Sequence, residues 1–146
     1  MADPTLESLL KLNQKELDAL YSAQTSPGTV PHGDTKGTAV FVPGTGFGKL
    51  LQAIARIFFW SGKRFATDQA SLVNIITIFH IPAIKAKVYP GNSWLDGNPS
   101  TFIDYSKTSF VAKMVHDEIR EVAPGLFLGK VYLWKKKTID FILVQA

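Results

Sequence analysis

The segment from His116 to Val122 combines charged side chains with the alternation of a strand, which makes it the first candidate for chemistry. Every second residue of a strand shares a face, so Arg120 and Val122 point the same way. If Val122 is buried, Arg120 is buried too, and a buried arginine requires a carboxylate partner. We expect Asp104 to be that partner, in a pair able to hold a carboxylate or carbonyl group of a ligand. The alternative is an exposed edge strand whose charges are solvated.

Four side chains form the candidate catalytic set: Asp104, Tyr105, Arg120 and Lys63. Asp104 would act as acid or base, Tyr105 as a proton donor, and the two cations would stabilise negative charge. The tyrosine–lysine and serine–lysine motifs of other enzymes do not occur here, because Ser109 stands where each motif requires its lysine. Local hydrogen bonds at a strand end explain the hydroxyl groups of this segment equally well.

Large aromatic rings suited to lining a pocket occur from residue 60 onward. The residues expected to contact a ligand are Trp60, Arg64, Tyr89, Trp94, His116 and Tyr132. Such rings also serve as ordinary core or rim residues, so the sequence leaves both roles open.

No metal or cofactor site is expected from the residue types. The chain has no cysteine, which excludes disulfides, thiolate zinc sites and thiol catalysis. Its three histidines, His32, His80 and His116, are far apart and form no closely spaced pair of metal ligands.

A glycine-rich loop, Gly44–Gly48, joins a short predicted strand to a predicted helix, an arrangement that holds phosphate in other proteins. The phosphate-binding motifs fail in detail. Leu50 replaces the Ser or Thr of a Walker loop, and Lys49 replaces the small residue of a dinucleotide fingerprint. We interpret the loop as a flexible entry to a helix, with an anion contact through Lys49 as the alternative.

The elements that would position these residues begin with a helical arm over residues 3–22. Asp3 and Pro4 are expected to start it, and Asn13 with Glu16 has the spacing of a capping box, which predicts a bend. The leucines of the arm stand at helical spacing, so we expect it to dock on the body rather than to project as a free tail. If it docked on another protein instead, the chain would be an interaction module.

The rest of the chain is typical of a mainly β (α+β) protein. A linker over residues 23–37 leads to short β-rich segments separated by turns, with one short helix at about 48–58. We expect a single domain over residues 1–146, in which residues 38–146 form an antiparallel, calycin-like β-barrel of about eight strands. The expected core includes Phe102, Ile119, Phe127, Val131, Phe141 and Leu143.

The segment Trp60–Phe65, WSGKRF, is similar to the W-x-G-K-R-F segment of small, largely uncharacterised bacterial proteins with a GXWXG-type domain. Leu126–Gly129 matches a further short motif of the same layout. The G-x-W-x-G motif itself is missing, because Gly37–Ala39 lacks the tryptophan. The resemblance covers residues 60–146. It implies a lipocalin-like or fatty-acid-binding-like barrel and no particular activity.

The net charge of +4 does not lead us to expect a nucleic-acid partner, because the basic residues are scattered apart from Lys135–Lys137, which we expect in a hairpin turn. No export signal and no apolar stretch long enough to span a bilayer is visible, so a cytoplasmic location is expected. The predicted partner is a small apolar or amphipathic molecule held inside the barrel. The alternative is a cofactor-free lyase, isomerase or cyclase acting on such a molecule, and a homodimer is compatible with either function.

Overall fold

The computed structural model describes residues 3–40, 60–67, 70–76, 81–106 and 114–146. Two short helices, α1 (Leu6–Leu10) and α2 (Gln14–Ser22), come first. The strands described are β1 (Gly33–Val40), β2 (Trp60–Phe65), β3 (Ser71–Ile76), β4 (Ile81–Asn92), β5 (Pro99–Asp104), β6 (Val115–Ala123), β7 (Leu126–Leu133) and β8 (Lys136–Gln145). The chain is therefore mainly β with short N-terminal helices, as the sequence predicts.

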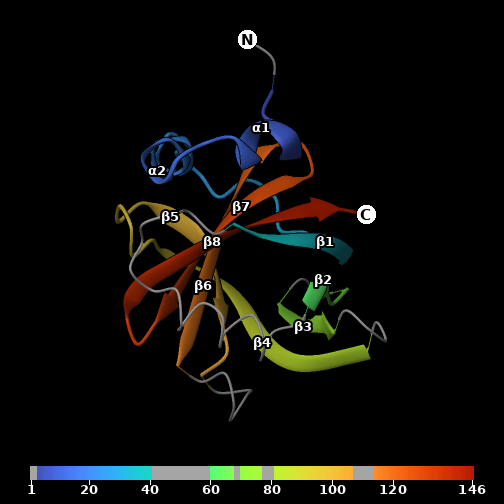
Figure 1. Cartoon of the computed structure of the whole chain (residues 1–146). Coiled ribbons are helices and arrows are strands. Elements are labelled where there is room, and N and C mark those ends of the chain that lie inside the picture. The colour runs from blue at the N-terminus through green and yellow to red at the C-terminus, as the bar shows by residue number, and fades with distance from the viewer. Residues whose placement is uncertain (1–2, 41–59, 68–69, 77–80, 107–113) are drawn as a thin grey trace.

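The strands form one strongly curled antiparallel sheet (Figure 1). Strands that are consecutive in the sequence are neighbours in the sheet, from β1 to β8. β8 also pairs with β1, from Thr35 opposite Gln145 to Val40 opposite Asp140, so the strand order is that of a closed barrel. Between β1 and β2 the described pairing is short and begins with Gly33 opposite Phe65. Several of these neighbours are joined by short connections, such as the two residues between β6 and β7, which antiparallel pairing allows.

Apolar side chains are buried on both faces of the sheet. One core fills the interior of the curl and includes Ile119 and Phe141. The other lies between the outer face and the helices, where Leu17 and Tyr21 of α2 pack with Ile142. Every residue of β7 is buried as a result. Alternation along β6, β7 and β8 therefore distinguishes two buried layers, rather than core from solvent.

The helical arm docks on the outer face of the sheet, which confirms that it is no free tail. Leu9, Leu17 and Tyr21 are fully buried. The predicted capping box of α2 is present, because the Asn13 side chain accepts from the Glu16 backbone and the Glu16 side chain accepts from the Asn13 backbone. Figure 1 shows both helices at the same end of the molecule, above β7.

The start of α1 differs from the prediction, since Thr5 rather than Asp3 is the N-cap. The Thr5 hydroxyl accepts from the Ser8 backbone at 3.1 Å, and the Ser8 hydroxyl accepts from the Thr5 backbone at 2.8 Å. This reciprocal pair satisfies two backbone N–H groups at once, so the helix begins at Leu6.

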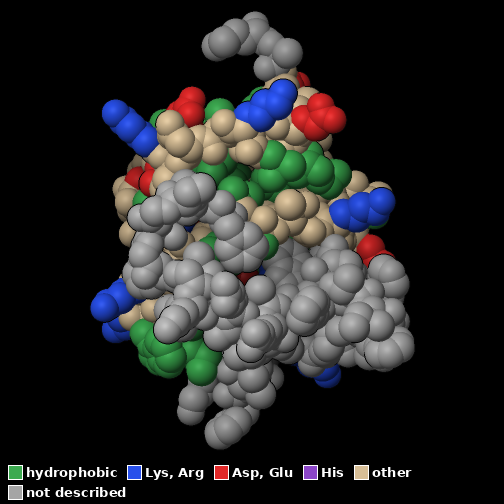
Figure 2. Space-filling model, in the orientation of Figure 1, with side chains coloured by type: hydrophobic (Ala, Val, Ile, Leu, Met, Phe, Trp, Pro, Cys, Tyr) green, Lys and Arg blue, Asp and Glu red, His purple; other side chains and the backbone are tan. Residues whose placement is uncertain are grey.

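A shallow apolar groove remains on the outer surface of the arm. Pro4, Leu9, Leu12 and Leu20 line it together with polar residues. Figure 2 shows hydrophobic side chains at this end of the molecule, flanked by acidic and basic groups. The leucines of the arm thus join it to the sheet while some of their outer edges reach the surface.

The first strand begins earlier than predicted. β1 starts at Gly33, inside the segment expected to be a linker, and residues 35–40 pair with β8. Two glycines and an aspartate give this segment low strand propensity, and pairing with a neighbouring strand overrides it. The predicted helix at 48–58 and the Gly44–Gly48 loop lie outside the described residues.

Most of the expected core residues are buried, namely Ile119, Phe127, Val131, Phe141 and Leu143. Phe102 is the exception, because it is only half-buried. Its neighbours Thr101 and Ile103 are buried, and alternation along β5 therefore places Phe102 on the outer face.

Candidate functional site

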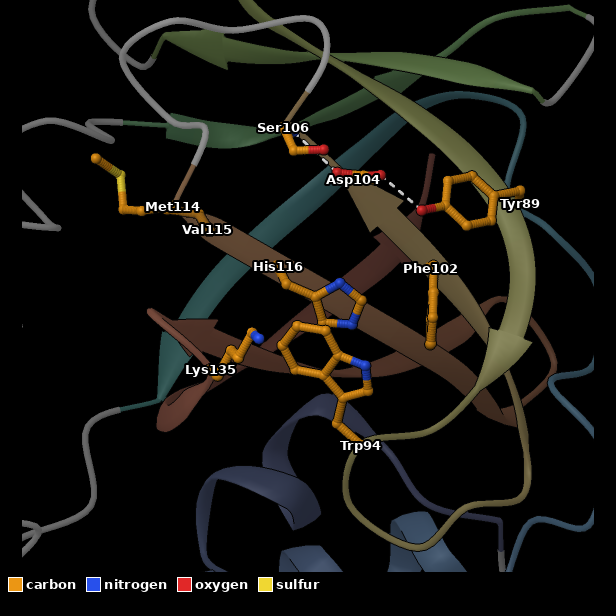
Figure 3. Close-up of a pocket in the computed structure, with 9 residues that line it drawn as sticks. All are labelled: Tyr89, Trp94, Phe102, Asp104, Ser106, Met114, Val115, His116 and Lys135. Atoms are coloured by element: carbon orange, nitrogen blue, oxygen red, sulfur yellow. Dashed lines mark hydrogen bonds between the residues drawn. The ribbon is translucent and has the colours of Figure 1, made fainter.

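A pocket of about 330 Å³ lies on the outer face of the sheet (Figure 3). Four rings line it: Tyr89 of β4, Trp94 of the loop after β4, Phe102 of β5 and His116 of β6. Ser106, Met114 and Val115 also line it, together with the charged residues Asp104 and Lys135.

The register of the sheet explains why residues from separate segments meet in this pocket. Tyr89 lies opposite Phe102, and Asp104 lies opposite His116. His116 in turn lies opposite Tyr132 of β7. Directly opposed residues of antiparallel strands share a face, so these side chains form one continuous patch.

The rings of the pocket are packed against one another. Trp94 stacks on His116 with ring centroids 3.7 Å apart and planes 14° apart, and Phe102 meets the same imidazole edge-on at 4.5 Å. Tyr132 packs against the edge of Trp94 at 5.2 Å. Even so, 45% of Trp94 and 41% of Tyr89 stay exposed. The rings thus form an ordered wall that offers apolar surface to a ligand.

Asp104 provides a negative charge beside this wall. The Tyr89 hydroxyl donates to its Oδ2 atom at 2.6 Å, and the Ser106 backbone donates to Oδ1 at 2.9 Å (Figure 3). Although partial burial alone would raise it, these hydrogen bonds hold the pKa of Asp104 below its ordinary value. The same contact raises the pKa of Tyr89 to about 12. At neutral pH the pair is therefore a carboxylate and a neutral phenol.

Glu118 anchors the loop that carries Trp94. This buried carboxylate accepts a hydrogen bond from the Trp94 backbone at 3.0 Å and another from the Ser93 hydroxyl. Tyr21 of α2 donates to it at 3.1 Å, and Nε2 of His116 lies 3.4 Å away. Burial alone would raise the pKa of Glu118, but these partners hold it below its ordinary value. Glu118 therefore fixes the loop on the sheet as a carboxylate.

Arg120 is fully buried, on the same outer face and beneath the helices. Its Nε atom donates to the Pro99 carbonyl at 3.0 Å, and its Nη1 atom donates to the Tyr21 carbonyl at 2.9 Å. Nη1 and Nη2 donate to the two carboxylate oxygens of Asp96 at 2.7 and 2.8 Å, and Nη2 also reaches the Asn98 carbonyl at 3.0 Å. An arginine has five N–H donors, and protein acceptors occupy all of them.

The expected pair of Arg120 and Asp104 is therefore wrong. Arg120 shares a face with Val122, as alternation requires, but that face meets the helical arm and the 93–98 loop rather than the interior. Its carboxylate partner is Asp96, whereas Asp104 bonds Tyr89. With its donors occupied, Arg120 is a clamp between sheet, loop and helix and has none left for a ligand.

Two of the candidate catalytic residues do meet, in the interior of the sheet. Nζ of Lys63 lies 2.6 Å from the Tyr105 hydroxyl and 3.2 Å from Oδ2 of Asp117. All three side chains are buried. Asp104 and Arg120, the other two candidates, lie on the outer face and contact neither.

The residues expected to contact a ligand also lie in separate places, some at the pocket and others away from it. Tyr89, Trp94 and His116 line the pocket, and Tyr132 flanks it. Arg64 pairs with Asp34 at 2.6 Å on the surface, away from these rings. Trp60 belongs to β2, and its side chain lies outside the described residues.

Several residues of these sites were not predicted, among them Phe102 as a pocket residue, Glu118, Asp117 and Lys135. Asp117 shares a face of β6 with Val115 and Ile119, which belong to the interior core. Its position could therefore be predicted once the inner face of the strand was known. Lys135 reaches the pocket from the turn between β7 and β8, and only the tertiary structure brings that turn close.

The described residues hold neither a cluster of metal-binding side chains nor a helix that could span a membrane. They contain no group of three or more His, Asp or Glu side chains placed to hold a metal ion. Neither described helix is long and apolar enough to cross a membrane.

Fold and site define a mainly β protein whose curled antiparallel sheet carries an aromatic pocket on its outer face. A protein from Thermomonospora curvata, known from its crystal structure, has a similar fold, with a TM-score of 0.61 and 17% sequence identity. The match covers 92% of this chain and 88% of that one. At this identity the likeness concerns the fold alone. No family model matches the chain, and no curated protein does.

Proposed function

We propose that the protein binds a small amphipathic molecule, and that the aromatic pocket receives it. The observation that carries this proposal is the exposure of Trp94 and Tyr89 around a hollow of about 330 Å³. Large rings left exposed together are typical of binding sites. The volume is at the lower end of the range for ligand pockets, which suits a molecule of one or two rings.

The charges of the pocket indicate which end of the ligand lies where. Asp104 is ionised at neutral pH, and a carboxylate can accept more than the two hydrogen bonds from Tyr89 and Ser106. The ligand's ring would pack against Trp94, with an amino group or another hydrogen-bond donor directed to Asp104. Lys135 is exposed on a turn and can move its ammonium group into solvent.

The predicted location inside a lipocalin-type barrel stays a second proposal. The strand order supports such a barrel, and the interior of the curl is lined by apolar side chains such as Ile103 and Phe141. The pocket on the outer face has the stronger support, because its volume and lining are defined by described residues.

The enzymatic alternative also stays a proposal, with fewer of its candidate catalytic residues. A cofactor-free lyase, isomerase or cyclase would use Lys63 and Tyr105, which are in contact, together with Asp117. Arg120 and Asp104 drop out, because each is held by other partners on the opposite face.

The test is a titration with 2-naphthylmethylamine, which carries an aromatic ring and an ammonium group, followed by 1H–15N NMR. We expect shift changes at the pocket residues, with an affinity about tenfold lower in Trp94→Leu and in Asp104→Asn. Trp134→Phe is the matched control, because Trp134 is 66% exposed and does not line the pocket. Naphthalene-2-carboxylate should bind more weakly than the amine. Binding unaffected by both pocket variants, or no binding at millimolar concentration, contradicts the proposal.

A further inference from the structure

Among the apolar side chains of the interior, the part of the chain that the structure describes places three polar ones in contact, Lys63, Tyr105 and Asp117. They come from β2, the end of β5 and β6, and are exposed by 3%, 1% and 3%. The Tyr105 hydroxyl lies 2.6 Å from Nζ of Lys63 and 3.3 Å from Oδ2 of Asp117. The Lys63 Nζ atom also lies 5.3 Å from the centre of the Phe141 ring.

This group differs from the other buried cations in what it joins. Arg120 and Lys130 are buried beneath the helices, and each bonds groups that tie the arm or a loop to the sheet. Lys63 and Asp117 are both strand residues that face the interior, so their contact links β2 and β6 of the sheet itself. Burying an ion pair costs free energy that a purely apolar filling would avoid. A stabilising role alone is therefore a poor explanation for this cluster.

Asp117 carries a second observation. Its Oδ2 atom contacts Lys63 and Tyr105, but its Oδ1 atom is buried and has no hydrogen-bond partner among the described residues. An unsatisfied buried carboxylate oxygen costs about 1–3 kcal/mol or more. A molecule that donates a hydrogen bond to Oδ1 would remove this cost, so the cluster has an acceptor ready for a bound group.

We propose that Lys63 is a nucleophile that forms an imine with aldehydes or ketones whose remaining part is apolar. The site lies on the face of the sheet opposite the aromatic pocket, so it stands independently of the proposed binding function. Burial lowers the pKa of Lys63, although the Asp117 carboxylate opposes this effect, and burial raises the pKa of Asp117. A neutral amine in apolar surroundings is the reactive form of lysine.

The reaction is balanced without an oxidant, a reductant or a cofactor. The Nζ lone pair attacks the carbonyl carbon, and the carbonyl π electrons move to oxygen. A proton passes from nitrogen to that oxygen, which gives a carbinolamine. The hydroxyl group then takes up a proton, the C–O bond breaks and water leaves, while the nitrogen lone pair forms the C=N bond. The protonated imine finally gives up its N–H proton, so no net proton is consumed. Tyr105 and Asp117 are both within hydrogen-bonding reach of Lys63 or each other, so they can carry these protons.

The experiment is reductive trapping on the full-length protein. The chain is incubated with hexanal and sodium cyanoborohydride between pH 6 and 10, digested, and its lysines are quantified by peptide mass spectrometry. We expect Lys63 to be alkylated at pH 7 about tenfold faster than the exposed Lys85 and Lys87, because burial lowers its pKa and leaves more of it as the neutral amine. Acetaldehyde, which has almost no apolar part, should show a smaller preference for Lys63.

Variants separate reactivity from structure. Asp117→Asn and Tyr105→Phe should change the pH profile of Lys63 alkylation while leaving that of Lys85 unchanged. Because the main measurement compares lysines within the unaltered protein, it does not depend on how well any variant folds. Lys63 labelled no faster than Lys85, or labelled only after unfolding in urea, overturns the proposal. If hexanal and acetaldehyde show the same preference for Lys63, the requirement that the rest of the aldehyde be apolar is overturned.

Discussion

The guanidinium group of Arg120 holds the carboxylate of Asp96 through two hydrogen bonds of 2.7 and 2.8 Å. Asp96 lies in the loop that also carries Trp94, so this pair draws the loop onto the outer face of the sheet. Glu118, two residues before Arg120, holds the same loop at Ser93 and Trp94. One stretch of β6 therefore positions the wall of the aromatic pocket.

We predict that Asp96→Asn lowers the free energy of unfolding by about 2–3 kcal/mol, because it removes the charge partner of a buried arginine. Urea denaturation followed by circular dichroism measures this change. Asp34→Asn is the matched control, since Asp34 forms a similar pair with Arg64 on the surface. It should cost less than about 1 kcal/mol. Equal effects of the two variants would show that the Arg120 pair adds nothing beyond a surface ion pair.

The Asp96 pair should also appear in the acid dependence of stability. Hydrogen bonds from Arg120 are the largest cause that lowers the pKa of Asp96, from 3.8 to about 2. A lowered pKa in the folded state means that the stabilisation is complete above about pH 4 and is lost as the pH falls towards 2. We therefore expect the difference in unfolding free energy between the wild type and Asp96→Asn to shrink across this range. A difference that stays constant from pH 5 to pH 2 would contradict the assignment.

Alternation along β6 was sufficient to predict that Arg120 and Val122 share a face, and that face is buried. It could not tell which buried layer the face meets, because β6, β7 and β8 are covered by the interior core on one side and by the helical arm on the other. The prediction that Arg120 would pair with Asp104 failed for that reason. The correct partner, Asp96, lies in a loop whose position depends on the tertiary structure.

Predictions from local sequence motifs were more reliable than predictions of which strands or side chains pair with one another. The capping box at Asn13 predicted where α2 begins, because its hydrogen bonds span only three residues. The early start of β1 at Gly33 was missed, because it depends on strand β8, more than a hundred residues away in the sequence. The pocket was found only in part for the same reason. Three of the four rings that line it, Tyr89, Trp94 and His116, were predicted as ligand contacts, but the register that assembles them follows from pairings across four strands.

Gly129 offers a test of the interior packing. It lies opposite Phe141 in the β7–β8 pair, and a Cβ atom at Gly129 would overlap the Phe141 ring. We predict that Gly129→Ala lowers the free energy of unfolding by about 1–3 kcal/mol through overpacking. In the double variant with Phe141→Leu, the loss of unfolding free energy should be smaller than the sum of the losses in the two single variants, because the smaller side chain leaves room for the methyl group. Additive costs in urea denaturation would contradict this packing.

Substitutions in the turn between β7 and β8 should stabilise the protein. Trp134 and Lys135 have φ angles of +48° and +68°, in the left-handed region, and they form a two-residue connection between Leu133 and the opposed Lys136. Turns of this kind favour Asn followed by Gly, because bulkier residues are strained there by roughly 1 kcal/mol each. Trp134 is 66% exposed, so its removal sacrifices little packing.

We therefore expect the double variant Trp134→Asn, Lys135→Gly to raise the free energy of unfolding by about 1–2 kcal/mol. The measurement is urea denaturation of the variant and the wild type under identical conditions. Lys136→Asn serves as the control, since Lys136 is an exposed residue in the strand with no positive φ angle, and it should bring no gain. An unchanged or lower stability in the double variant would mean that the turn is not strained, or that Trp134 contributes packing on the surface that outweighs the strain.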